Sequence, residues 1–129
     1  PEIGYIDPLT DEERKVPLEI RAPGEINTLY NKTFEDVGLY KETPVLPFAT
    51  LGTLGWAHSN QAIDDGSSQF FFFLYEAELT PAGRNLIDGR NAAFGYVVEG
   101  AEIIENLGVE DKILSIKVTD GENYFKEHA

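Results

Sequence analysis

The sequence contains no cysteine, which excludes a disulfide scaffold, a thiol nucleophile and a zinc–thiolate site. A cysteine-free chain tolerates any redox poise, so its compartment stays open on this ground alone. Methionine is also absent. Because a primary translation product starts with methionine, we expect this chain, which begins at Pro1, to be a processed or trimmed product that lacks an N-terminal part.

Basic side chains are scarce: 10 Lys and Arg stand against 23 Asp and Glu, and the formal net charge is −13. Binding to nucleic acid or to an anionic membrane needs a basic patch, and the sequence offers none. Long hydrophobic runs are absent too, because the longest uncharged apolar run, residues 70–75, is far shorter than the roughly 20 residues that cross a bilayer. We therefore expect neither a nucleic-acid partner nor membrane insertion.

Apolar residues are nevertheless plentiful. Hydrophobic residues make up 42% of the 129 positions and aromatic residues 12%, which is too much apolar material for a disordered acidic chain. The length suits one small domain with a modest core. We expect a single domain over residues 1–129, with a loop over residues 1–15 and a tail over residues 121–129.

Short apolar segments bounded by glycine, proline and polar turns predict a mainly β fold. Strands are expected over residues 16–21, 45–56, 69–75, 92–98 and 112–119, and short helices over residues 31–40 and 101–107. Gly52 and Gly55 indicate a bend or bulge where another backbone or a ligand comes close. We expect the sheet to curl into an antiparallel barrel, because closure removes the edges of the aromatic strand.

Two local patterns refine this prediction. Thr33 is a candidate N-cap, with Asp36 three residues later, for the first helix. Side chains alternate along a strand, so at most half of the rings in the run Phe70 to Phe73 can face the same side. Phe71 is therefore expected to face one side, and Phe70 and Phe72 to face the other.

Motifs for metal, hydrolytic or nucleotide chemistry are missing. His58 and His128 are 70 positions apart and form no metal-binding pair, and the chain contains no G-x-S-x-G, H-E-x-x-H, P-loop or dinucleotide fingerprint. The acidic pairs at 64–65 and 110–111 are interpreted as solvated turn residues. We expect no metal ion and no cofactor.

Three ordered segments carry a family resemblance. Residues 52–58 read G-T-L-G-W-A-H, residues 66–71 read G-S-S-Q-F-F, and residues 86–100 read L-I-D-G-R-N-A-A-F-G-Y-V-V-E-G. In this order and spacing they resemble the cyclophilin family of peptidyl-prolyl isomerases, with Trp56 in place of a Met and Ile87 in place of a Leu. The match covers roughly residues 30–118.

The resemblance implies an eight-stranded antiparallel β-barrel with two short capping helices. The family's catalytic Arg belongs to an F-x-x-Q-x-G-D region that precedes all the matched segments and is not seen here. Neither Arg14 nor Arg21 matches that motif, so we assign no catalytic residue. We expect the chain to lack N-terminal strands and its barrel to stay open unless an N-terminal segment or a second chain completes it.

The resemblance also implies substrate-binding positions. Phe71 corresponds to the floor of a proline socket, Ile87 to its aliphatic wall, and Ala57 and His58 to the backbone that pairs with substrate. Gln69 is expected to hydrogen-bond near the pocket. Two further positions depart from the family pattern: Leu86 replaces a Trp important for cyclosporin binding, and Asn91 replaces a pocket His.

The following segments resemble the thylakoid-lumen branch of the family in plants and cyanobacteria: 16–21, 37–41, 67–69, 78–81, and 88–90 with 94–97. That resemblance implies a thylakoid lumen or periplasmic location, a role in protein folding or photosystem II assembly, and proline-containing peptides or proteins as clients. The prediction is a peptidyl-prolyl cis-trans isomerase. The alternatives are a non-catalytic proline-peptide binding or assembly module with weak or no isomerase activity, and an acidic scaffold whose groove is filled by its own N-terminal region.

Overall fold

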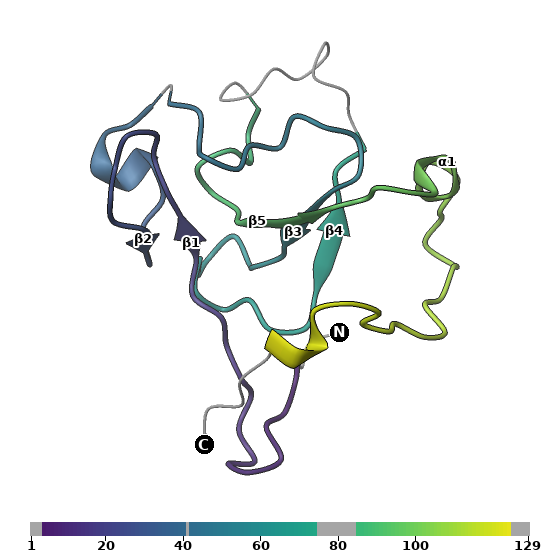
Figure 1. Cartoon of the computed structure of the whole chain (residues 1–129). Helices are drawn as coiled ribbons and strands as arrows, with labels where there is room; N and C mark the ends of the chain where they lie inside the picture. Colours follow the sequence, from purple (N-terminus) through teal and green to yellow (C-terminus); the bar gives the residue numbers. More distant parts are fainter. Residues whose placement is uncertain (1–3, 41, 75–84, 125–129) are drawn as a thin grey trace.

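The computed structural model describes residues 4–40, 42–74 and 85–124, and within them the chain is mainly β with antiparallel pairing, as predicted (Figure 1). The strands are β1 (Glu19–Ile20), β2 (Leu29–Tyr30), β3 (Thr53–Trp56), β4 (Phe70–Phe72) and β5 (Ala93–Tyr96). The helices are the 3-10 turns η1 (Glu35–Val37) and η2 (Glu122–Tyr124) and the α-helical turn α1 (Ala101–Ile104). Strands β1 and β2 form a two-stranded sheet, and β3 lies between β4 and β5 in a three-stranded sheet.

The centre of the three-stranded sheet is built around Gly55. This residue pairs with Phe71 of β4, and the register with β5 shifts between Leu54 and Gly55, which confirms the predicted bulge. A Cβ atom at position 55 would overlap the rings of both Phe71 and Phe48. Glycine is therefore required here because two aromatic rings occupy the space of a side chain.

The aromatic run on β4 divides between the two faces of the sheet, as its alternation predicts. Phe71 and Phe73 both pack on the fully buried ring of Phe48, with centroids 5.5 and 5.9 Å away. Phe70 and Phe72 pack edge to face with each other, and Phe70 also meets the ring of Phe94. The sheet thus has one face closed by Phe48 and a second face that carries the other rings.

A second core lies under the small sheet. Its buried members are every second residue of the segment 18–22 and the ring that directly precedes η1: Leu18, Ile20, Ala22 and Phe34. Half-buried Leu29, Leu39, Ile63 and Ala92 pack against them. The alternation confirms the extended conformation predicted for residues 16–21, although the paired strand is limited to β1.

The first predicted helix is the 3-10 turn η1. The Thr33 N–H donates to the Asp36 carboxylate at 2.8 Å, and the Asp36 N–H donates to the Thr33 hydroxyl at 3.1 Å. This reciprocal pair is the capping arrangement expected from the sequence. Gly38, with φ of 80°, ends the turn in the left-handed region that glycine adopts most easily.

Two predicted strands are corrected by the structure. The predicted strand over residues 45–56 is paired only at β3, because Pro47 has no N–H and the N–H of Phe48 donates to Asp88 at 2.7 Å. The predicted closing strand over residues 112–119 is wrong for this structure, since no strand is formed there. Its apolar side chains are exposed, Leu114 by 94%, because the segment pairs with none of the described strands.

The remaining differences concern length and closure. The predicted helix over residues 101–107 is the single turn α1, and within the described residues no helix is long and apolar enough to cross a membrane. The barrel is not closed in the part of the chain that the structure describes: the β1–β2 sheet and the three-stranded sheet remain separate (Figure 1). Residue 75, the segment 78–81 and His128 lie outside the described residues.

Phe48 is expected to be a main determinant of stability. Replacing it in Phe48→Ala leaves a cavity beneath Phe71 and Phe73 and should lower the free energy of unfolding by about 3–5 kcal/mol, measured by urea titration. The matched control is Leu9→Ala, whose side chain is 86% exposed and which should change stability by less than ~0.5 kcal/mol. Equal losses in the two variants would contradict this placement of the core.

The capping pair predicts a pH dependence. The hydrogen bond from the Thr33 N–H, with a further bond to the Thr33 side chain, holds the pKa of the Asp36 carboxyl below its usual value of 3.8. A lowered folded-state pKa stabilises the fold above pH 3.8, and this contribution is lost as the pH falls through the folded pKa. Asp36→Asn should therefore lower the thermal midpoint by a few degrees at neutral pH, and the difference from the wild type should shrink in acid. A gap that stays constant down to strong acid would rule out the ionised cap.

Candidate functional site

Four of the seven residues predicted to bind substrate gather at one end of the three-stranded sheet: Ala57, His58, Gln69 and Asn91. Because β4 and β5 run antiparallel to β3, the end of β3 lies beside the starts of both neighbours. Ala57 follows β3, Gln69 precedes β4, and Asn91 comes shortly before β5. The Ala57 N–H donates to the Gln69 carbonyl at 3.0 Å, and the Asn91 amide donates to the Trp56 carbonyl at 3.2 Å.

His58 links this end of the sheet to the turn before β5. Its ring Nε2 lies 2.6 Å from the carbonyl oxygen of Arg90, and its Nδ1 lies 2.8 Å from the carbonyl oxygen of Ser59. The structure therefore places Ala57, His58, Gln69 and Asn91 together, although they come from three separate segments of the sequence.

Residues 85–91 form a tight turn that carries the two aliphatic positions of the predicted site. The side-chain oxygen of Asn85 accepts from the N–H groups of Ile87 and Asp88 at 3.1 and 2.8 Å. The Ile87 carbonyl accepts from the N–H groups of Arg90 and Asn91 at 3.1 and 3.0 Å. Ile87 is half-buried, whereas the Leu86 side chain is 88% exposed and lies on the surface of the turn.

Phe48 connects this turn to Phe71, and the sequence analysis did not identify it as a site residue. Its N–H donates to the Asp88 carboxylate at 2.7 Å, and its carbonyl accepts from the Asn85 amide at 2.8 Å. Its ring stacks on Phe71 with a centroid distance of 5.5 Å. Phe48 thus contacts both Phe71, through its ring, and the turn that carries Ile87, through its backbone. The Pro-Phe pair at 47–48 falls inside the predicted strand over residues 45–56 and belongs to none of the matched motifs.

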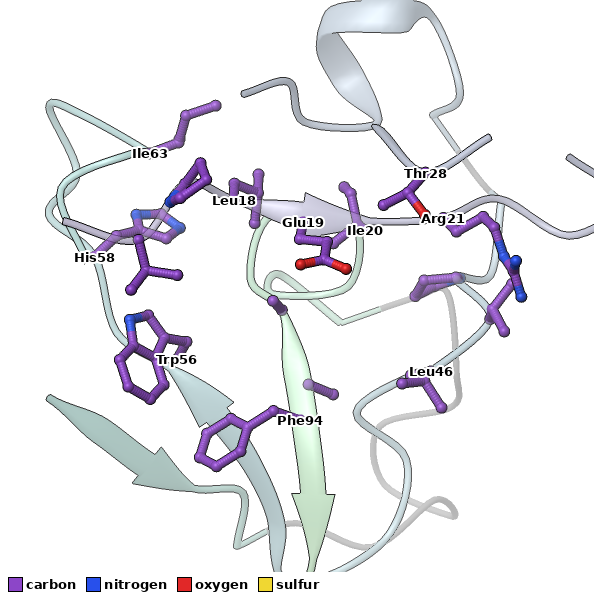
Figure 2. Close-up of a pocket in the computed structure, with 16 residues that line it drawn as sticks. Leu18, Glu19, Ile20, Arg21, Thr28, Leu46, Trp56, His58, Ile63 and Phe94 are labelled. Atoms are coloured by element: carbon purple, nitrogen blue, oxygen red, sulfur yellow. The ribbon is translucent and has the colours of Figure 1, made fainter. Parts of the chain in front are cut away.

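A cavity of about 350 Å³ lies between β1 and the three-stranded sheet, on the face of that sheet that points away from Phe48 (Figure 2). Figure 2 shows Trp56 and Phe94 across from Leu18 and Ile20, and the lining is largely apolar. The indole Nε1 of Trp56 is buried and has no hydrogen-bond partner among the described residues. His58 reaches this cavity, but Phe71 lies on the other face of the sheet and does not line it.

A second, polar hollow of about 300 Å³ lies beside the end of β3. The site residues Ala57, His58 and Gln69 line it, together with charged and hydroxyl-bearing side chains: Glu13, Lys15, Ser59, Asp65, Ser67 and Ser68. Neither hollow could be predicted from local sequence patterns, because the walls of each join segments that lie far apart in the chain.

The acidic pair at 64–65 is structural rather than merely solvated. The Asp65 carboxylate accepts the Ser59 N–H at 2.7 Å, and the Asp64 carboxylate accepts the Leu18 N–H at 3.0 Å. Hydrogen bonds from the Ser59 side chain and backbone hold the pKa of Asp65 below its usual value. Asp65 therefore keeps its negative charge down to low pH, close to His58.

Comparison with known proteins gives the same family. Residues 5–122 match the family described as cyclophilin type peptidyl-prolyl cis-trans isomerase/CLD. A protein of Synechocystis sp. named as a thylakoid lumen peptidyl-prolyl cis-trans isomerase is 50% identical over 121 residues, which cover 94% of this chain and 32% of the relative. The chloroplastic peptidyl-prolyl cis-trans isomerase CYP38 of Arabidopsis thaliana is 46% identical over 121 residues, 94% of this chain and 28% of the relative.

A third relative, the chloroplastic peptidyl-prolyl cis-trans isomerase CYP37 of Arabidopsis thaliana, is 32% identical over 114 residues, 87% of this chain and 24% of its own length. The chain thus spans about a third or less of the length of these curated relatives. The family match extends over nearly all of the described fold and includes every predicted site position. The chain belongs to the cyclophilin-type peptidyl-prolyl cis-trans isomerase family.

Proposed function

We propose that this chain binds X-Pro segments of proteins at the end of β3 and that, as part of its longer parent protein, it takes part in accelerating their cis-trans isomerisation. The observation that carries the proposal is the convergence of Ala57, His58, Gln69 and Asn91 at one end of the sheet, through the bonds described above. The names of all three relatives favour an isomerase over a non-catalytic binding module. The name of the cyanobacterial relative supports a thylakoid lumen location.

The reaction needs little chemistry from the protein. An X-Pro bond prefers the trans form by only about 0.5–1 kcal/mol, yet rotation crosses a barrier of roughly 18–20 kcal/mol. Twisting removes amide resonance and makes the prolyl nitrogen more basic. A catalyst therefore works by binding the twisted amide more tightly than either planar form, and it needs no nucleophile.

The site residues take the following parts in this proposal. Phe71 forms the floor of the proline socket and Ile87 its wall, and both are held through Phe48. Since the Ala57 N–H already donates to Gln69, we assign pairing with the substrate backbone to the Ala57 carbonyl and the His58 N–H. We assign no residue of this chain as the cationic donor to the prolyl nitrogen.

We further propose that a preceding segment of the parent chain completes the barrel. Strands β4 and β5 are the two edges of the three-stranded sheet, and the face with Trp56 and Phe94 remains open as the cavity of Figure 2. The apolar side chains of residues 112–119 are likewise exposed. Added strands would cover both regions and bury apolar area, which is the usual reason that barrels close.

The socket assignment is tested with two variants of the same strand. Phe71→Ala should weaken binding of a blocked proline-containing peptide about tenfold, because it removes a large part of the apolar contact of the ring. The control is Phe72→Ala, which deletes the same ring from the opposite face of β4 and should leave binding near the wild-type value. Binding can be followed by NMR titration, with circular dichroism confirming that both variants fold. Equal effects of the two substitutions would remove Phe71 from the socket.

Catalysis is tested by NMR exchange spectroscopy on an X-Pro peptide. We expect this chain alone to give little acceleration and the longer natural protein to give clear acceleration, because the electrostatic donor and the missing strands are then present. Peptide binding without acceleration in either form would support the non-catalytic binding module instead. Absence of both binding and acceleration in the longer protein would contradict the proposed function.

A further inference from the structure

Both ring nitrogens of His58 face carbonyl oxygens. Nε2 lies 2.6 Å from the oxygen of Arg90 and Nδ1 lies 2.8 Å from the oxygen of Ser59. A carbonyl oxygen only accepts hydrogen bonds, and a neutral imidazole carries a single N–H. Two such bonds are therefore made at once only when the ring is protonated. In the neutral ring, one nitrogen lone pair points at a carbonyl oxygen, and that contact becomes repulsive.

The charges around His58 are of both signs. The polar hollow that His58 shares with Asp65 also contains Glu13 and Lys15, and the apolar cavity on its other side contains Glu19 and Arg21. The turn bonded to its Nε2 carries the Asp88 carboxylate and the Arg90 guanidinium, and the Asp88 carboxylate accepts the Phe48 N–H. Asp65 is tied to the neighbouring Ser59 and keeps its negative charge to low pH.

The bond to Arg90 has a mechanical consequence. Arg90 belongs to the turn whose backbone is closed by the Ile87 carbonyl, and Asn91 of the same turn donates to the Trp56 carbonyl. These two links join the turn to the end of β3. The Asn91 link does not change with pH in the physiological range, whereas an imidazole changes its charge between about pH 5 and pH 8.

We propose that His58 is a positioning residue whose protonated ring holds the turn of residues 87–91 against the end of β3, so that binding of proline-containing segments strengthens as the pH falls. This inference rests on the proposed function for its effect on binding. The sign follows from the hydrogen bonds: the protonated ring donates a charge-assisted bond to the Arg90 carbonyl, which is roughly twice as strong as the bond that a neutral ring donates, and it bonds the Ser59 carbonyl as well. His58 thereby sets the position of Ile87 relative to the backbone that pairs with the substrate.

The first experiment needs no ligand and uses the natural full-length protein. NMR of the ring nitrogens reports the protonation of His58, and amide shifts report the turn. We expect both ring nitrogens to carry protons in acid, and the amides of Ile87 and Asn91 to shift with the same midpoint as the ring. A ring that titrates without moving these amides, or that stays neutral down to about pH 5, would overturn the proposal.

The second experiment measures binding of a blocked peptide that contains X-Pro and no titratable side chain. The wild type should bind about three- to tenfold more tightly at about pH 5.5 than at about pH 7.5, which is the effect of one hydrogen bond of ordinary net strength. In His58→Gln the amide donates at every pH, so this difference should disappear. The control is His128→Gln, which removes the only other histidine of the sequence and should keep the wild-type pH dependence.

The two experiments separate the two proposals. A peptide that binds equally at both pH values, or a His58→Gln variant that keeps the wild-type pH dependence, overturns the role of His58 and leaves the proposed function intact. If no peptide binds at any pH, the proposed function fails. The coupled titration of the ring and the turn amides still decides whether His58 holds the turn.

Discussion

The arrangement of the site depends on how Phe48 is held. Its backbone is bonded on both sides to the turn of residues 85–88, and its ring fills the space that Gly55 leaves empty. Phe71 stacks on that ring, so a single buried residue joins the aromatic strand, the central glycine and the turn before β5. An aromatic ring in a fully buried position tolerates little displacement, because the interior around it is close-packed. Phe48 thus contacts both Phe71, the proposed socket floor, and the turn that carries Ile87, the proposed wall.

The antiparallel order of the three strands brings the polar residues of the site together. With β3 in the middle, its last residues lie beside the first residues of both neighbours, and three hydrogen bonds cross that boundary: Ala57 to Gln69, His58 to Arg90 and Asn91 to Trp56. The opposite face of the same sheet, with Trp56 and Phe94, forms a different environment that is apolar and only partly covered. The two faces of the sheet therefore differ: one packs around the buried ring of Phe48, and the other carries the open apolar cavity.

His58 is significant in this fold because of the two carbonyl oxygens that its ring nitrogens face. A histidine in a polar loop is unremarkable in a sequence, and its importance here arises because two carbonyl oxygens face its two nitrogens. One carbonyl belongs to its own neighbour, and the other belongs to a residue 32 positions away. Only the second contact joins elements of the fold, which is why a change of charge on this ring can act on the turn.

The sequence by itself determined the family, the mainly antiparallel β class, the capping pair of Thr33 and Asp36 and the division of the phenylalanine run between two faces. These features follow from local spacing: a side chain alternates along its own strand, and a cap bonds within three residues. Tertiary structure alone decided the role of Phe48, the two hollows and the link from His58 to Arg90, because each joins segments that no local pattern relates. It also decided that residues 112–119 form no strand. Their alternation is typical of a strand, but a strand forms only where it pairs with another strand, and residues 112–119 pair with none of the described strands.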